Sequence, residues 1–245
     1  MIVPAKPRLI RLPDSDGQPM ADNTLQYEWI ATLKGGCDAL VADRDDVFVA
    51  GDHLIYPVEP VGEADVIDVE KVPRIAPDVY VAFGRPKGHR GSYKVWEENG
   101  IFPQVVFEVW SPSNRLQQME DKRLAYEEYG AEEYYIVYPD HPAFVEGWVR
   151  KDGRLTRVAD IKTWISPRLG IRYDLRKGQL KVIRPDGTPF LTYLELNEKW
   201  TAEQERAERE ARRAESAEQA AAGEAAKAAR LAAKLRELGL DPDAV

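Results

Sequence analysis

The alternation of apolar and polar positions predicts a series of short strands in the first two thirds of the chain. Runs rich in β-branched and aromatic residues, separated by polar turns, occupy 39–42, 47–50, 54–61, 79–83, 104–110 and 133–138. Two later segments, 147–158 and 180–193, contain Lys-Asp-Gly and Pro-Asp-Gly turn signals, which predict hairpins. The pattern therefore favours a sheet built from several short strands.

Helical periodicity predicts one helix before these strands and one between the last two of them. Asp22 or Asn23 can cap the first helix, and the pair Gly35-Gly36 is expected to end it. The second helix is expected at about 115–129. The order of helix, strands, helix, strand and hairpins predicts an α/β or α+β fold, in which helices flank a mixed sheet.

The composition changes sharply at residue 198. The segment 198–238 consists mainly of Ala, Glu, Arg and Lys and predicts a long polar helix. Its alanines recur at a 4–3 spacing, which allows two interpretations: a solvated helix, or a weak coiled coil with its own copy or a partner. We therefore divide the chain into an extended arm (1–21), a core (22–197), this helix (198–238) and a tail (239–245).

Charge and cysteine content narrow the possible functions. The net charge of -8 argues against broad coating of nucleic acid, although a carboxylate metal site is itself negative. A single cysteine, Cys37, excludes an intrachain disulfide and favours a reducing compartment. Without a signal-like N-terminus or an apolar run of about 18 residues, we expect a cytoplasmic protein that does not enter the membrane.

Two carboxylates occupy unusual positions on predicted strands. Side chains alternate across a strand, so Glu108 shares a face with Trp110 in the middle of an apolar segment. A carboxylate there is costly unless it is solvated, paired or bound to a cation. Asp78 opens another apolar strand, although a Pro-Asp pair is also common in turns. Both residues are candidate ligands of a hard cation, with simple solvent exposure as the alternative.

A lysine on the second helix is the third candidate. Lys122 lies on one helical stripe with Met119, Tyr126 and Tyr129. Its ammonium either reaches water beyond a packed stem or points toward the strand of Glu108. Two carboxylates and a lysine form a unit that can hold Mg²⁺, activate water and stabilise negative charge on a phosphate.

Longer motifs around these residues resemble a known family. The stretches APDVYVAFGRPKG, QVVFEVWSPSNR and DKRLAYEEYGAEEYYIVYPD together resemble the Uma-two family, which belongs to the PD-(D/E)xK nuclease superfamily. The resemblance extends over about 20–195 and is strongest over 76–140. It implies a restriction-endonuclease-like mixed sheet flanked by helices, with Asp78 and Glu108 as metal ligands.

The sequence differs from the superfamily pattern in the position of the lysine. The residue two positions after the acid is Trp110, and Lys122 matches family members in which the lysine has moved to the following helix. Many members also have an acid one turn before that lysine, where this chain has Gln118. Glu28 on the first helix is a further candidate, and the Val109 carbonyl is expected to be the third metal ligand.

A basic, glycine-rich loop follows the Asp78 strand. Its cations are Arg85, Lys87, Arg90 and Lys94. They can bind phosphate beside a metal site, or they can be the solvated cations of a flexible loop.

We therefore predict an Mg²⁺-dependent endonuclease that hydrolyses phosphodiester bonds in DNA, with Mn²⁺ able to substitute. In this prediction Asp78, Glu108 and Lys122 are catalytic. The alternatives are a catalytically decayed nuclease scaffold that binds nucleic acid or protein, and an assembly module in which the C-terminal helix dominates. In the assembly module this helix would pair weakly with a partner or with its own copy in a homo-oligomer.

Overall fold

The computed structural model describes residues 11–61, 67–239 and 241, and its contacts divide the chain into two compact units. The first unit, 1–192, contains the helices α1 (Thr24–Leu40) and α2 (Leu116–Tyr129) and all the strands. The second unit, 193–245, contains the helix α3 (Tyr193–Glu237).

A six-stranded sheet forms the centre of the first unit. Its order is β1 (Val47–Gly51), β3 (Val79–Phe83), β5 (Val105–Val109), β6 (Glu133–Tyr138), β7 (Phe144–Lys151) and β8 (Arg154–Arg157). Neighbouring strands are antiparallel except β5 and β6, which α2 connects as a parallel crossover. Two small ladders accompany it, β2 (Ile55–Tyr56) with β4 (Tyr93–Lys94), and β9 (Arg172–Asp174) with β10 (Lys181–Ile183).

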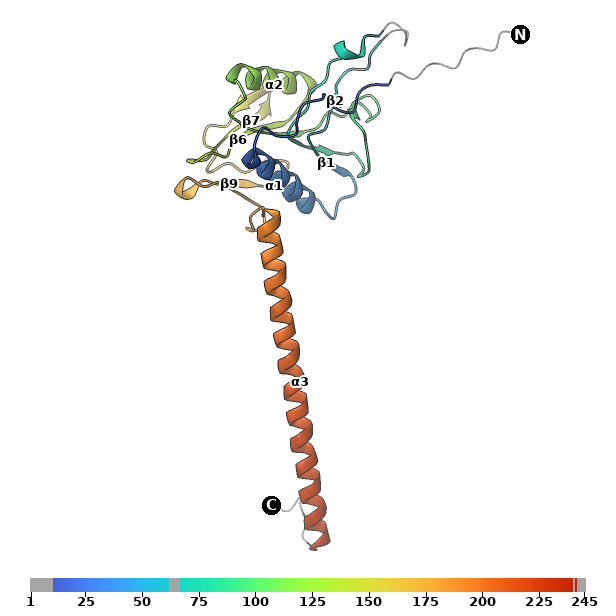
Figure 1. The fold of residues 1–245 in the computed structure, drawn as a ribbon, viewed down its shortest axis with the longest axis vertical. Coiled ribbons are helices and arrows are strands. Elements are labelled where there is room, and N and C mark those ends of the chain that lie inside the picture. The colour runs from blue at the N-terminus through green and yellow to red at the C-terminus, as the bar shows by residue number, and fades with distance from the viewer. Residues whose placement is uncertain (1–10, 62–66, 240, 242–245) are drawn as a thin grey trace, which may run out of the picture. The chain divides into compact units, whose positions relative to one another are not determined.

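The helices α1 and α2 cover opposite faces of this sheet (Figure 1). Alternation along the strands creates two cores, because successive side chains point to opposite sides. One core joins α1 residues such as Leu33 to Val79 and Phe107, and the other joins Tyr126 of α2 to Val106 and Tyr134. The predicted mixed sheet flanked by helices is therefore confirmed.

The first helix is longer than the sequence pattern predicted. It runs through Gly35 and Gly36 to Leu40, so the expectation that the glycine pair ends it is wrong. A Cβ atom at position 36 would overlap the ring of Phe190, so the glycine is needed for this close contact rather than for a helix end. The expected strand at 39–42 is consequently the end of a helix and the turn after it.

The turn between β7 and β8 confirms one of the two predicted hairpins. Asp152 and Gly153 both have positive φ angles, 49° and 81°, as a two-residue hairpin turn requires. The second turn signal is only partly confirmed, since β10 meets the later segment in a single bridge, Ile183 with Pro189.

The ends of the chain are described only in part. Residues 1–10 of the predicted arm lie outside the described residues, and 11–21 contain no helix or strand. The Tyr56 hydroxyl donates a hydrogen bond to the Pro13 carbonyl at 2.7 Å, which attaches this arm to the core. The helix α3, 45 residues long and without a buried residue, confirms the long polar C-terminal helix. No helix in the described part of the chain is long and apolar enough to cross a membrane.

Candidate active site

The register of two central strands brings the predicted carboxylates together. Val79 of β3 pairs with Phe107 of β5 in an antiparallel ladder, and one further step places Asp78 opposite Glu108. Facing residues in such a ladder have Cβ atoms about 4.5–5.5 Å apart. The Asp78 carboxylate also accepts a hydrogen bond from the Val109 N–H at 2.6 Å, which fixes it at the end of β5.

Helix α2 supplies two donors to Glu108. The Lys122 ammonium donates to one carboxylate oxygen at 2.7 Å, and the Tyr126 hydroxyl donates to the other at 2.5 Å. Residues four apart lie on the same side of a helix, so one face of α2 delivers both groups. Glu108 is 1% exposed, whereas the Lys122 side chain is 30% exposed. The ammonium thus points to the acid rather than only to water, and it also donates to the Ala76 carbonyl at 3.3 Å.

Two acids and one lysine share the site, and their surroundings shift the pKa values of Asp78 and Lys122 upward. Burial, and next the charge of Glu108, raise the pKa of Asp78 to about 8, although Lys122 and the Val109 N–H oppose the shift. Burial of Lys122 lowers its pKa, but Glu108 and Asp78 outweigh this effect and the net shift is upward. The lysine therefore stays protonated, whereas Asp78 in the metal-free protein favours its neutral form at neutral pH.

The oxygen-rich donor set fits a hard cation such as Mg²⁺. Within the described residues, no three side chains of His, Cys, Asp or Glu form a metal-binding group. The third protein ligand beside Asp78 and Glu108 would consequently be a backbone oxygen, and the Val109 carbonyl, next to Glu108 on the chain, is the candidate. Mg²⁺ suits such a partial set, because it commonly keeps several water ligands.

Helix α1 contacts the site through a residue that the sequence pattern did not identify. Gln26 is buried, and its side-chain amide donates to the Val109 carbonyl at 3.1 Å. Glu28, the candidate from this helix, is exposed. The overlooked signal was a polar residue on the apolar stripe, four and seven positions before Ile30 and Leu33.

Gln118 has a structural role at the start of α2. Its side-chain oxygen accepts a hydrogen bond from the Arg115 N–H at 3.0 Å, and the residue is exposed. Such a bond satisfies one of the free N–H groups of a helix N-terminus. Gln118 therefore caps the helix that carries Lys122, and Lys122 rather than Gln118 bonds Glu108 among the described residues.

Asp52 is a second residue that the sequence pattern did not identify. It follows β1, where Gly51 pairs with Val79, and its N–H donates to the Asp78 carbonyl at 3.0 Å. It adopts a positive φ of 46°, which is uncommon for a residue other than glycine. Burial raises the pKa of its carboxyl, and Lys122 opposes the shift. The available signal was a Gly-Asp-His turn directly after an apolar strand.

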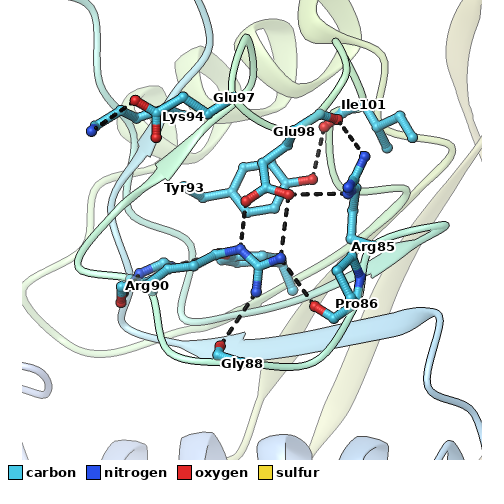
Figure 2. Close-up of polar contacts among 11 residues, drawn as sticks. Arg85, Pro86, Gly88, Arg90, Tyr93, Lys94, Glu97, Glu98 and Ile101 are labelled. Atoms are coloured by element: carbon cyan, nitrogen blue, oxygen red, sulfur yellow. Dashed lines mark hydrogen bonds and ion pairs between the residues drawn. The ribbon is translucent and has the colours of Figure 1, made fainter.

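The two arginines of the basic loop bind an acid within the fold (Figure 2). Arg90 donates to the Glu98 carboxylate at 2.5 Å, and Arg85 lies 3.0 Å from the other oxygen of that carboxylate. Arg90 also donates to the Pro86 carbonyl and lies over the Phe48 ring, 4.1 Å from its centroid. Glu98 is buried, so these contacts hold the loop against the core.

The two lysines of the loop have more exposed partners. Lys87 donates to the Ala42 carbonyl at 2.8 Å, and Lys94 pairs with Glu97 at 3.1 Å. Among the described residues, no contact of the four loop cations reaches Asp78 or Glu108. Phosphate binding by all four cations would require Arg85 and Arg90 to break their ion pairs with Glu98. Lys87 and Lys94 are therefore the better candidates for phosphate binding.

One of the comparisons with known proteins, the family model, agrees with the predicted resemblance. A solved structure described as a putative nuclease belonging to DUF820, from Anabaena variabilis ATCC 29413, is 11% identical, with a TM-score of 0.42 over 61% of this chain and 74% of that chain. Among curated proteins, none matches the chain significantly. The family model Uma2, "Putative restriction endonuclease", matches residues 62–169. The resemblance to the Uma-two family is thereby confirmed for the segment that contains Asp78, Glu108 and Lys122.

Proposed function

We propose that this chain is a divalent-metal-dependent endonuclease that hydrolyses phosphodiester bonds in DNA. One observation carries the proposal: a buried carboxylate, Glu108, lies opposite Asp78 and accepts hydrogen bonds from both Lys122 and Tyr126. The match of the surrounding segment to a restriction endonuclease family supports the same conclusion.

Three groups of the chain would hold the metal: the carboxylates of Asp78 and Glu108, and the Val109 carbonyl. Mg²⁺ or Mn²⁺ bound there would lower the pKa of a water molecule and neutralise charge on a phosphate. The Val109 N–H fixes Asp78, and the Gln26 amide fixes the Val109 carbonyl. The ligands are thus oriented by hydrogen bonds that do not depend on the metal.

Lys122 and Tyr126 have different tasks in this proposal. The raised pKa of Lys122 keeps its ammonium charged, and the partial exposure of the side chain lets it approach a substrate. It can therefore donate to an attacking water molecule or to a phosphate oxygen as negative charge develops. Tyr126 is fully buried and holds one oxygen of Glu108, so it positions the acid.

The test combines calorimetric titration with Mn²⁺ and a cleavage assay on linear and circular DNA. We expect the unmodified chain to bind Mn²⁺ and cleave DNA, and we expect Asp78→Ala to lose both properties. Asp121→Ala is the matched control, because Asp121 is an exposed acid on α2 whose carboxylate accepts a hydrogen bond from Gln117.

Two results would overturn the proposal. An unmodified chain that binds no Mn²⁺ and leaves DNA intact would refute it entirely. Salt-dependent DNA binding without metal-dependent cleavage would instead indicate a scaffold that binds nucleic acid and has lost its catalytic activity.

A further inference from the structure

Three aromatic side chains form a stacked row at the end of the sheet that carries the candidate site. The ring centroids of Trp110 and Tyr138 are 5.3 Å apart with planes at 28°, and those of Tyr138 and Phe144 are 3.9 Å apart at 10°. The rings come from the ends of three adjacent strands, β5, β6 and β7. We call these three residues the aromatic row.

The aromatic row lies on the same face of the sheet as Glu108. Trp110 is two residues beyond Glu108, so alternation places both side chains on one side, about 6.6 Å apart along the strand. The Trp110 N–H donates to the Val137 carbonyl at 2.8 Å, which continues the ladder to Tyr138. Tyr138 is in turn the register partner of Phe144. The aromatic row thus starts directly beside the proposed catalytic carboxylate.

This row is incompletely covered by the rest of the first unit. Phe144 is 47% exposed, and Trp110 and Tyr138 are both partly exposed. Phe107 of β5, an aromatic side chain of the same sheet that serves packing, is by contrast fully buried. Phe144 is both the terminal ring of the stack and its most exposed member, so another planar group can approach the stack at this end.

The acids beside the row are the exposed Asp140, in the turn between Tyr138 and Phe144, and Glu146. Glu146 is the nearest acid on β7, but it accepts a hydrogen bond from the Tyr138 hydroxyl at 2.8 Å and pairs with Arg157. The Arg157 side chain is 65% exposed, so a cation is available to a phosphate on this side of the sheet. The local combination is aromatic faces with a partly free cation, which suits bases and phosphates together.

We propose that the aromatic row stacks unpaired bases of the nucleic acid strand that is cleaved at Asp78 and Glu108. The inference rests on the proposed nuclease function and specifies its substrate class as single-stranded or locally unpaired nucleic acid. Bases in an intact duplex already stack on one another and do not offer a free face. Stacking on aromatic rings requires no particular base, so this contact selects for strand state rather than sequence.

Binding without divalent metal tests the row separately from catalysis. The probes are fluorescein-labelled 12-nucleotide DNA in three forms: single-stranded, duplex, and an abasic strand with the same number of phosphates. We expect the unmodified chain to prefer the single strand over both other probes. Phe144→Ala should weaken single-strand binding about 5-fold or more, the lower limit for losing one stacked base, and leave abasic binding unchanged.

Two further variants separate stacking from folding. Phe144→Tyr keeps an aromatic ring and should restore binding of the single strand, whereas Phe144→Leu should not. Tyr27→Ala is the matched control, because Tyr27 is an aromatic residue of α1 that is 55% exposed. Thermal melting of each variant shows whether the first unit is still folded.

The outcomes distinguish this inference from the proposed function. If Phe144→Ala and Phe144→Leu bind all three probes as the unmodified chain does, the row is not a stacking surface, and Mn²⁺-dependent cleavage would still support the nuclease. If binding falls as expected but the unmodified chain never cleaves, the stacking surface stands and the nuclease proposal fails. Preference for the duplex, or absence of binding to all three probes, overturns the inference.

Discussion

Replacement of Lys122 by methionine removes a charge from a buried carboxylate. Glu108 is 1% exposed and accepts hydrogen bonds from Lys122 and Tyr126. Methionine has a length similar to that of lysine and preserves most of the packing of its stem. The change therefore leaves Glu108 with the Tyr126 hydroxyl alone, in an environment that disfavours an ionised group.

The expected cost follows from the geometry of this pair. Removing one partner of a buried ion pair typically costs about 3–5 kcal/mol. The Lys122 side chain is 30% exposed and Tyr126 remains in place, so we expect the lower limit, about 3 kcal/mol. For a unit of this size about 2–4 °C of melting temperature corresponds to each kcal/mol, so the metal-free variant should melt roughly 6–12 °C lower.

The assay measures thermal melting with and without saturating Mn²⁺, and single-turnover cleavage of DNA. A cation at Glu108 replaces the missing charge, so Mn²⁺ should narrow the difference in melting temperature. Cleavage should remain slower by about 10²-fold or more, the scale for loss of one positioned electrostatic group. Lys71→Met is the control, since its exposed pair with Asp68 contributes at most about 1 kcal/mol.

Two results would refute this reasoning. A metal-free Lys122→Met chain that melts like the unmodified chain would show that the ion pair does not stabilise the fold. A variant that cleaves at the unmodified rate would show that Lys122 has no part in catalysis, and another cation would have to be sought.

Three other variants test separate parts of the structure. Asp78 has a pKa raised to about 8, so in metal-free protein its contribution to stability is present below about pH 4 and is lost as the pH rises through 8. The Asp78→Asn variant should therefore be more stable than the unmodified chain at pH 8 and similarly stable at pH 4. Equal melting temperatures of the two chains at both pH values would contradict this. Glu98→Gln leaves Arg85 and Arg90 without a carboxylate and should lower the melting temperature of the first unit by several degrees, unlike the exposed control Glu97→Gln. A chain ending at Thr192 should keep the melting temperature of the first unit, because α3 contains no buried residue; failure of this chain to fold would show that the core needs the helix.

The sequence predicted the central sheet and the pairing of the two acids because their information is local. Alternation along 79–83 and 104–110 identified both strands and the faces of their side chains, and the ladder then places Asp78 opposite Glu108. The stripe on the second helix predicted that Lys122 lies beside Tyr126, and the structure directs both residues to Glu108. The pattern could not identify Tyr126 as a hydrogen-bond partner of Glu108, because a tyrosine on an apolar stripe is usually interpreted as a packing residue.

The environment of the basic loop depends on contacts that local patterns do not reveal. Four cations among glycines suggest a phosphate-binding loop, yet Arg85 and Arg90 share the carboxylate of Glu98 after the chain has turned back through β4. The extension of α1 through Gly36 has a similar cause, since Phe190 lies more than 150 positions later in the sequence. In both cases the role of a local sequence motif depends on a contact that forms only in the folded chain.

The position of the lysine connects the candidate site to the aromatic row. A residue two positions after Glu108 on β5 necessarily points to the same side of the sheet, which is why a lysine there could serve the acid directly. In this chain α2 provides the ammonium from Lys122 instead, while the strand position holds Trp110. Because the charge comes from the helix, the strand can carry an aromatic ring that stacks with Tyr138 beside the acid. With the ammonium supplied by α2, the strand position is open to Trp110 and to the proposed base-stacking surface next to the carboxylates.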